Sequence, residues 1–288
     1  MILITGASGN VGREVLRQAA AAGLKLRAAY QSADKAGQAP AGVETVLLDY
    51  GRPETLRAAL QGIETLFLVG PPTAELAVLE GNAVAESKRA AVPRIVKLSA
   101  LGGRQAIFPR RHADSEDVIK ASGIPYTFLR PNGFMQNFVN YSAGTIKTQD
   151  AFYGTEGNGA VSHIDIRDIA AAAVKVLCSS GHEGKAYPLT GPEALTNAQV
   201  AQKISDAVGR TISYVDLPAA ELRKALLAAG LPEWSADALL DLQRLYREGG
   251  GSVVDPTFEH LTGRKATSFD QFARDYAGVF RSERRAAS

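Results

Sequence analysis

Three glycines near the start of the chain have the spacing of a phosphate-binding loop. Gly6, Gly9 and Gly12 follow an apolar run at 2–5 and precede a helical pattern at 11–22. In that context Gly6 allows a tight turn, Gly9 lets the backbone approach a pyrophosphate, and Gly12 lets helix and strand pack closely. The helix start adds free N–H groups and a positive dipole end. A glycine triplet alone would also fit an ordinary turn, but this context predicts a dinucleotide site that contains Gly6, Ser8, Gly9, Asn10, Val11 and Gly12.

The segment after the second predicted strand bears on the choice between NAD and NADP. An acidic side chain at that strand end would bind the ribose 2′-hydroxyl of NAD. The chain has no carboxylate there, because Gln31 and Ser32 come next. Both can donate hydrogen bonds to a 2′-phosphate and Lys35 adds positive charge, whereas Asp34 favours NAD. We expect NADP, with NAD as the alternative; a polar loop without a role in binding is the other interpretation.

Two more strand ends lie where the rest of a dinucleotide would pass. Asp49 and Tyr50 close the third predicted strand, at the edge of the sheet where an adenine would lie. Val69, Gly70 and Pro71 close the fourth, where the backbone must pass near the middle of the cofactor. We expect cofactor contacts from both stretches, although Asp49 can also be only the polar end of a strand.

These residues require a sheet that brings several strand ends together. From residue 1 to about 130, short β-type runs alternate with helical patterns. Such alternation implies parallel strands joined by crossover helices, which is an α/β fold with a Rossmann-type, doubly wound sheet. We expect strands at 2–5, 26–30, 44–48, 65–69, 95–99 and 126–129, and helices at 11–22, 53–61, 75–91 and 112–121.

The second half of the chain has a different rhythm, in which helical patterns dominate. We expect residues 1–150 to form mainly the NAD(P)-binding domain and residues 151–280 mainly a smaller C-terminal α+β lobe for substrate, with the chain crossing between them. Residues 281–288 are predicted to be a disordered tail. The elements expected in this half are helices at 165–178, 196–208, 219–229, 235–247 and 268–279, and strands at 161–163, 186–189 and 212–216.

Composition excludes several classes of function. A net charge of +2 over 288 residues gives no reason to expect nucleic acid or a membrane surface as partner. No apolar run approaches the ~20 residues that cross a bilayer, and the glycine motif begins too early for a signal peptide, so we expect a cytoplasmic protein. The one cysteine, Cys178, allows no disulfide within the chain and is expected in the core. The four histidines lack metal-binding spacing, so we expect no metal.

The motifs resemble those of the short-chain dehydrogenase/reductase superfamily, in its extended and atypical branch. Residues 5–12 match the pattern TGxxGxxG, Asp49 stands at the adenine position, and residues 123–137 resemble the block GxPYTxLRPxxFMxN. The chain is most similar to the NmrA-like group, which includes NAD(P)H-dependent quinone reductases, triphenylmethane-dye reductases and cofactor-sensing regulators. The resemblance covers about residues 1–250 and implies a Rossmann-type fold with a small C-terminal substrate lobe.

The same resemblance places the reacting end of the site. The catalytic pair of the superfamily is Tyr-x-x-x-Lys, and its two positions fall on Phe108 and His112. Phe108 has no proton to give, which argues against alcohol dehydrogenation and sugar epimerisation. His112, with an ordinary pKa near ~6.5, can act at the ribose and nicotinamide, and Glu116 can orient it from one turn away. A structural histidine and a solvated glutamate are the alternatives.

Two strand ends complete the predicted reacting end. Ser99 closes the fifth strand, where the superfamily often carries a substrate-polarising Ser or Thr; a hydroxyl that satisfies nearby backbone is the alternative. Asn132 follows the sixth strand, and we expect it near the nicotinamide carboxamide. Met135, Phe138 and Tyr141 are expected to line an apolar pocket for a planar acceptor, with a core role for one or two of them as the alternative.

Our leading hypothesis is an NAD(P)H-dependent reductase that transfers hydride to a quinone or similar planar acceptor. Hydride transfer is the chemistry of the cofactor, and such acceptors need no strong protein acid. The alternative is an NmrA-like redox sensor that binds NAD(P) and regulates a partner without turnover, which Phe108 favours. A reductase of the plant-phenolic type ranks third, because it would need a lysine where His112 stands. We expect a monomer or homodimer with a small-molecule partner.

Overall fold

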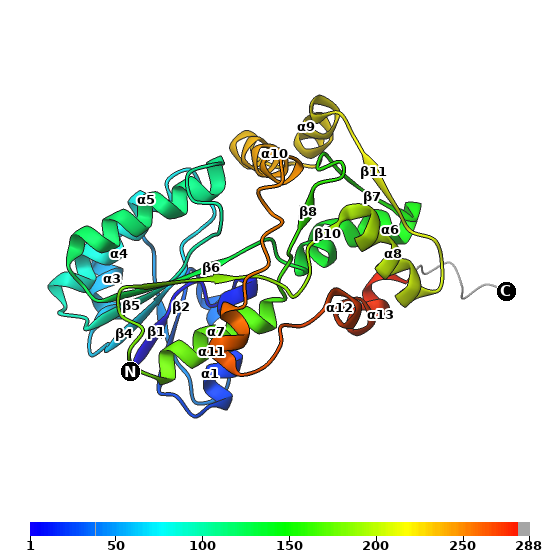
Figure 1. Ribbon diagram of the computed structural model, residues 1–288. Helices are drawn as coiled ribbons and strands as arrows, with labels where there is room; N and C mark the ends of the chain where they lie inside the picture. The colour runs from blue at the N-terminus through cyan, green and yellow to red at the C-terminus, as the bar shows by residue number, and fades with distance from the viewer. Residues whose placement is uncertain (38, 282–288) are drawn as a thin grey trace.

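The centre of the computed structural model is a seven-stranded parallel sheet in which β1 lies between β2 and β4 (Figure 1). The structure describes residues 1–37 and 39–281. From β1 the chain builds outward first on one side and then on the other, which is the doubly wound order that the sequence predicted. In spatial order the strands are β3 (Glu44–Leu47), β2 (Leu26–Tyr30), β1 (Ile2–Ile4), β4 (Thr65–Leu68), β5 (Arg94–Leu98), β6 (Tyr126–Pro131) and β9 (Lys185–Leu189).

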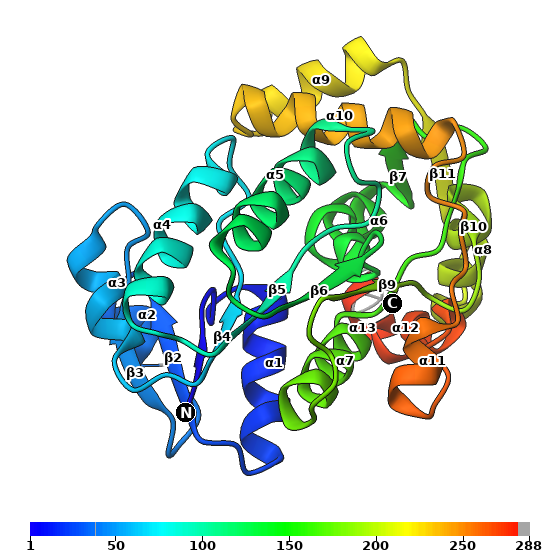
Figure 2. The same cartoon turned by 60° about the vertical axis from the view of Figure 1, so that its left-hand side comes forward.

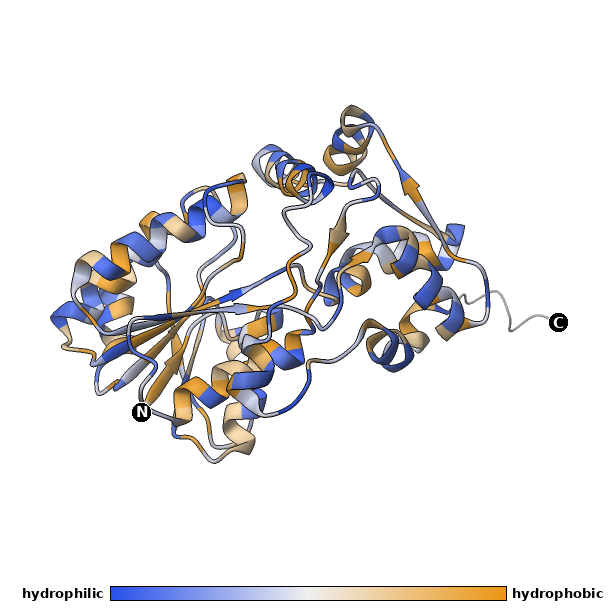
Figure 3. Cartoon of the chain, viewed as in Figure 1, coloured by the Kyte–Doolittle hydropathy of each residue, from blue (hydrophilic) through white to orange (hydrophobic). Residues whose placement is uncertain are grey.

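Helices cover both faces of this sheet and explain why its central strands are apolar. On one face lie α1 (Asn10–Ala21), α7 (Ile166–Cys178) and α11 (Thr257–Thr262), and their apolar sides form one core with the strands. On the other lie α3 (Pro53–Leu60), α4 (Leu76–Arg89) and α5 (Ile107–Ser122), over a second core. Figure 3 shows apolar strands between amphipathic helices. A sheet covered on both faces needs continuous apolar strands.

The C-terminal lobe has a core of its own, built on aromatic rings such as Phe152 and Phe269. It contains two small sheets, β7 with β11 and β8 with β10, beside the carboxyl end of the main sheet (Figure 2). The strands are β7 (Ala151–Gly154), β8 (Ala160–Val161), β10 (Leu195–Thr196) and β11 (Ser213–Asp216). The helices are the π-helix η1 (Phe138–Ser142), α6 (Ala143–Gln149), α8 (Asn197–Val208), α9 (Ala219–Ala228), α10 (Glu233–Arg247), α12 (Phe269–Asp275) and α13 (Ala277–Phe280); α2 (Ala33–Ala36) lies beside β2.

Two placements differ from the sequence analysis. The strand expected at 186–189 within the lobe is β9 of the main sheet, where it pairs with β6 in parallel. A short run with mixed polarity does not indicate which sheet it joins, because strand pairing depends on residues far away in the sequence. Cys178, expected in the core, is exposed because it is the last residue of α7. The tail predicted over 281–288 lies, apart from Arg281, outside the described residues.

Side chains cap some of the helix starts. Asp165 caps α7 by accepting a hydrogen bond from the Arg167 amide at 2.7 Å, as its predicted place at a helix start requires. Thr196 and Gln199 form a reciprocal capping box at α8. The start of α1, like those of α3, α4 and α5, has no capping side chain, and Gly9 stands at its N-cap. Its place directly after the glycine loop makes it the first part of the candidate site.

Candidate active site

The glycine loop has the close backbone approach that its spacing predicts. A methyl group on Gly12 would lie 2.1 Å from the Gly6 carbonyl oxygen, so only glycine fits between helix and loop. Gly6 has a φ of 61°, in the left-handed region that glycine adopts without strain. The Gly9 amide donates to the Gly6 carbonyl at 2.9 Å and closes the turn. The loop therefore forms a tight cradle directly after β1.

The start of α1 suits an anion. Its first turn contains no acidic residue and its N-cap has no side-chain hydrogen bond, so no side chain caps the first N–H groups. Ser8, Gly9 and Asn10 are exposed, whereas Val11 is buried against the sheet. Free N–H groups and the positive end of a helix dipole bind phosphate. The residues present therefore fit a dinucleotide pyrophosphate.

The loop expected at the adenosine ribose begins where β2 ends. Gln31 and Lys35 are exposed and Ser32 is partly exposed. Ser32 stands at the N-cap of α2, and its hydroxyl makes no capping hydrogen bond. Asp34 lies in the first turn of that helix rather than at the strand end. The arrangement leaves hydroxyl, amide and ammonium groups on one exposed loop, and their contact with a 2′-phosphate stays a prediction.

The strand ends after β3 and β4 divide into exposed and buried residues. Asp49 is exposed and accepts a hydrogen bond from the Gly51 amide at 2.8 Å, so it shapes the turn after β3. Tyr50 is buried, and its hydroxyl donates to the Val69 carbonyl at 2.9 Å. The Tyr50 side chain thus braces the backbone after β4 from below, which differs from the direct cofactor contact that the sequence analysis expected. Val69, Gly70 and Pro71 are each partly exposed.

A buried ionic cluster lies under the strand ends, and the sequence analysis missed it. Lys97 of β5 and Glu80 of α4 form an ion pair in which both side chains are fully buried. The second carboxylate oxygen of Glu80 accepts from the Gly70 amide at 2.9 Å, and Ser115 of α5 also donates to this carboxylate. The only sequence signals were charged residues within patterns that otherwise predict burial. Removing either charge would leave the other one buried without its partner.

His112 lies beside this cluster and is itself buried. Its ring packs edge-on against Phe108, with ring centres 4.9 Å apart. Burial lowers the pKa of His112 well below its ordinary value, and the positive charge of Lys97 lowers it further. This corrects the expectation of an ordinary pKa near ~6.5. The imidazole is neutral near physiological pH, and its Nδ1 atom is buried without a hydrogen-bond partner.

Ser99 and Glu116 contact each other rather than their expected partners. The Ser99 hydroxyl donates to the Glu116 carboxylate at 2.6 Å, and the Arg130 guanidinium donates to the same carboxylate. Glu116 is therefore neither solvated nor an orienting partner of His112, because its two oxygens are engaged by Ser99 and Arg130. The hydroxyl proton of Ser99 is used within the protein, which argues against the substrate-polarising role.

Asn132 has a bracing role in the structure. Its amide group donates to the Ser162 hydroxyl at 2.9 Å and to the Gly251 carbonyl at 2.8 Å. These bonds connect the end of β6 to two segments of the C-terminal lobe. The donors that we expected at the nicotinamide carboxamide are therefore used internally, and long-range partners of this kind leave no trace in local spacing.

The three residues expected to line an acceptor pocket lie in two different environments. Met135 and Phe138 are 1% and 7% exposed and belong to the core of the lobe, where Phe138 packs on Phe152 and Phe269. Tyr141 is 78% exposed, on the outside of η1. This differs from the predicted common pocket, because the turn of η1 directs Phe138 inward and Tyr141 outward. A core role was the stated alternative for one or two of them.

Some buried side-chain polar atoms in the described residues have no hydrogen-bond partner. They are Thr73 Oγ1 after β4, Arg111 Nε and His112 Nδ1 on α5, and His163 Nδ1 before α7. Buried polar groups are almost always paired, so unpaired atoms of this kind indicate a place for a ligand or ordered water. Among residues 1–37 and 39–281, no three potential metal ligands lie together.

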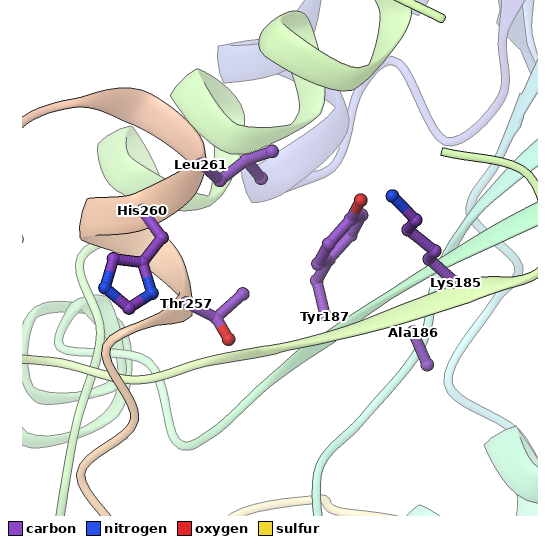
Figure 4. Close-up of a pocket in the computed structure, with 6 residues that line it drawn as sticks. All are labelled: Lys185, Ala186, Tyr187, Thr257, His260 and Leu261. Carbon is purple, nitrogen blue, oxygen red and sulfur yellow. The ribbon is translucent and has the colours of Figure 1, made fainter. Parts of the chain in front are cut away.

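Two cavities of the protein surface lie away from the glycine loop. One, of about 460 Å³, is lined by Lys185 and Tyr187 of β9 and by His260 of α11 (Figure 4). Another, of about 530 Å³, lies between α9 and α10 and is lined by residues such as Leu217 and Arg244. Neither contains a residue that the glycine motif or the strand ends had indicated. The candidate site therefore rests on strand-end geometry.

A comparison with known protein families decides what the glycine loop belongs to. A family described as NAD(P)H-binding matches residues 6–179, which include the glycine loop, β2 to β6 and α7. The chain belongs to this family. The NAD(P)H-binding match contains every strand end named above, and the resemblance to the NmrA-like group is confirmed.

Relatives match the chain over nearly its whole length. It is 37% identical over 284 residues to the NAD(P)H azoreductase of Xenophilus azovorans, covering 97% of this chain and 99% of that protein. It superimposes with a TM-score of 0.87 and 30% identity on the NADPH-dependent quinone oxidoreductase of Escherichia coli complexed with NADPH, covering 96% and 99%. The triphenylmethane reductase of Citrobacter sp. complexed with NADP(H) gives 0.86 and 27%, covering 96% and 100%. The C-terminal lobe is therefore shared along with the NAD(P)H-binding part.

Proposed function

We propose that this protein is an NADPH-dependent reductase that transfers hydride to a quinone, an azo compound or another planar acceptor. The observation that carries the proposal is the whole-length relationship to an NAD(P)H azoreductase, over 97% of this chain. The glycine cradle and the uncapped start of α1 supply the binding geometry that such a reaction needs. The missing phenol at Phe108 fits an acceptor that takes hydride without a strong acid.

The residues that would hold the dinucleotide come from successive strand ends. The N–H groups at the start of α1 would bind the pyrophosphate. Gly70 leaves room for Glu80, whose side chain would lie 2.7 Å from a methyl group there, and the backbone after β4 would pass near the middle of the cofactor. Gln31, Ser32 and Lys35 would bind the 2′-phosphate of NADP. When bound, the reduced nicotinamide supplies the hydride, and the protein contributes its orientation. A carboxylate at the end of β2, which would favour NAD, is not part of this chain.

His112 would act in its neutral form. A buried imidazole that stays unprotonated near pH ~7 can donate or accept one hydrogen bond, but it cannot carry a stored proton to the product. The buried Lys97–Glu80 pair fixes the elements on either side of it, since Glu80 holds the Gly70 amide and Ser115 anchors α5. The proton that completes the reduced acceptor would come from water.

The experiment is a turnover assay with purified protein. Oxidation of NADPH and NADH is followed by the loss of nicotinamide absorbance with a panel of naphthoquinones, azo dyes and triphenylmethane dyes. We expect turnover with at least one class and faster turnover with NADPH. Cofactor binding without any turnover across the panel would reject the reductase and favour the redox sensor. Phe108 at the position of the catalytic tyrosine is also compatible with such a sensor.

Two further expectations concern the location of the protein in the cell and its oligomeric state. Within the part of the chain that the structure describes, no helix has the length and apolar content to span a membrane. A cytoplasmic location and a monomeric or homodimeric state remain predictions. Fractionation of the native cells and light scattering of the purified protein test them.

A further inference from the structure

A hydroxyl and an imidazole meet at one point after β6. A methyl group on Gly133 would lie 3.0 Å from Cδ2 and 3.3 Å from Nε2 of His163, and 3.3 Å from the hydroxyl oxygen of Tyr246. All three residues are partly exposed. The Tyr246 hydroxyl and the Cδ2–Nε2 edge of the His163 ring therefore converge on the Gly133 backbone.

Backbone hydrogen bonds hold His163 at this point. The Ile164 amide donates to the Gly133 carbonyl at 2.9 Å, and the Met135 amide donates to the Ile164 carbonyl at 3.0 Å. The segment before α7 thus runs parallel to the residues after β6 and pairs with them at Phe134 and Ile164. His163 also packs edge-on against Phe138, with ring centres 5.2 Å apart. Its position is fixed from both sides.

Tyr246 reaches the same point from the C-terminal lobe. It is the next-to-last residue of α10, which lies across the start of α5 (Figure 2). The Asp241 carboxylate accepts from the Ile107 amide at 2.7 Å, one residue before Phe108. Leu245 and Pro109 both approach Gly102, within 3.4 Å of where its methyl group would be. α10 is therefore held against the start of α5, which carries Phe108, while its Tyr246 reaches Gly133 after β6.

Both side chains are held in their uncharged forms. Burial raises the pKa of Tyr246, the Glu156 carboxylate raises it further, and the Gly133 backbone amide opposes them. Burial lowers the pKa of His163 to about 4, opposed by a hydrogen bond with the Val161 backbone. The His163 Nδ1 atom, which is not the ring nitrogen that approaches Gly133, is buried without a hydrogen-bond partner.

We propose that Tyr246 and His163 form the hydrogen-bonding pair for the electron-accepting atom of the substrate, so that α10 supplies the hydroxyl that Phe108 lacks. The proposal rests on the reductase function. When hydride leaves the reduced nicotinamide and bonds to the acceptor, the acceptor gains an electron pair and negative charge on oxygen or nitrogen. The phenol donates a hydrogen bond to that atom, and a proton from water then completes the product. Donors aimed at developing charge are worth more in the transition state than in the bound substrate.

The test compares Y246F, H163Q and the control Y153F, using NADPH and 2-methyl-1,4-naphthoquinone. Tyr153 is an exposed phenol in the same lobe, bonded to Gln149. We expect Y246F to lower kcat about 10- to 100-fold, with a smaller change in KM and an unchanged Kd for NADPH. H163Q, which keeps an amide donor, should lose less than H163A. Y153F should stay within about twofold of the wild type.

Several outcomes would overturn the pair. A kcat of Y246F within about threefold of Y153F would do so, as would equal losses in H163Q and H163A. If Y246F does not fold, H163Q, H163A and G133A are used instead. The methyl group of G133A would separate the Tyr246 hydroxyl from the His163 ring. An unchanged kcat in all three variants rejects the proposal.

A wild type that turns over no acceptor would reject the reductase function rather than the pair. In that case equilibrium dialysis measures binding of the naphthoquinone to NADP⁺-loaded wild type and Y246F. Weaker binding by Y246F supports the pair, and equal affinities overturn it.

Discussion

The dinucleotide end and the reacting end of the candidate site use different kinds of polar group. At the glycine loop the binding groups are backbone N–H groups of one short stretch, and Ser8, Gly9 and Asn10 are exposed. At the reacting end the polar groups are side chains from β5, α4 and α5, and Lys97, Glu80 and Ser115 are buried. One end is local and open, and the other is long-range and enclosed.

This difference implies that the two ends are linked to folding in different ways. A loop of exposed backbone can lose its ligand contacts while the sheet beneath it stays intact. A buried ion pair cannot lose one partner without leaving a charge in a region of low dielectric. Substitutions at the reacting end should therefore change the free energy of unfolding, whereas substitutions at the exposed part of the loop should change only binding.

The largest expected effect is that of Lys97→Met. The variant leaves the Glu80 carboxylate buried with only the Gly70 amide and Ser115, so we expect a loss of about 3–5 kcal/mol in the free energy of unfolding. Urea unfolding followed by circular dichroism measures it. The double variant K97M/E80Q should recover part of this loss, because it removes both charges together.

The exposed pair between Arg52 and Glu54 is the matched control for Lys97. Their side chains are 64% and 59% exposed, so R52A should change the free energy of unfolding by about 0.5 kcal/mol or less. If K97M were as mild as R52A, the reacting end would not be coupled to the fold, and the contrast between the two ends would be lost.

The next effect concerns the open end, with Gly9→Ala. Gly9 has a φ of −79°, which any residue adopts, and an added methyl group would approach only the Gly6 carbonyl, at 3.2 Å. The fold should tolerate it, with a change of about 1 kcal/mol or less. The methyl group would occupy space needed by the pyrophosphate, and we expect Kd for NADPH to rise about 10- to 100-fold. Fluorescence titration measures Kd.

Two other glycines sharpen that result. Gly144→Ala adds a methyl group in α6 with nothing within 4 Å and should leave binding unchanged. Gly12→Ala places its methyl group 2.1 Å from backbone and should damage fold and binding together. Equal Kd values for G9A and G144A would show that the exposed loop does not hold the dinucleotide.

Much of the fold could be predicted because its signals are local. The apolar runs and helix caps of the first 130 residues predicted six strands of the main sheet and their parallel order. The seventh strand, β9, was assigned to the wrong sheet, because Lys185–Leu189 carries no local mark of its partner β6. Pairing between strands far apart in sequence depends on the whole sheet, which local pattern does not describe.

The candidate site follows the same division. The geometry of Gly6 and Gly12 agrees with their spacing, because close backbone approach depends on glycine at fixed intervals. The partners of Ser99 and Asn132 could not be predicted, since Glu116 and Gly251 reach them only through the packing of other elements. Tyr246 was missed for the same reason, lying more than a hundred residues from the motif whose hydroxyl it replaces in our proposal.

A smaller effect is expected in the pH dependence of stability at the reacting end. Burial holds the pKa of His163 at about 4 in the folded protein, below the ~6.5 of an unfolded chain. Between these values the unfolded state binds more protons, so stability falls as the pH is lowered from about 6.5 toward 4. Between pH ~7 and pH ~5 the wild type should lose about 1–2 kcal/mol more than H163Q in urea unfolding. Parallel pH curves for the two proteins would mean that His163 is not held neutral by burial.

The smallest expected effect is that of Lys35→Ala, which removes one positive charge from the dinucleotide end of the site. Lys35 is exposed beside Ser32 after β2, where screening by water limits an ionic contact to about 1 kcal/mol. Kd for NADPH should therefore rise about three- to tenfold, while Kd for NADH stays the same because NADH lacks the 2′-phosphate. Lys25→Ala changes an equally exposed lysine before the other end of β2 and should alter neither affinity. If K35A weakened both cofactors equally, the loop after β2 would contribute general charge rather than recognition of the 2′-phosphate, and the preference for NADPH would have to come from elsewhere in the site.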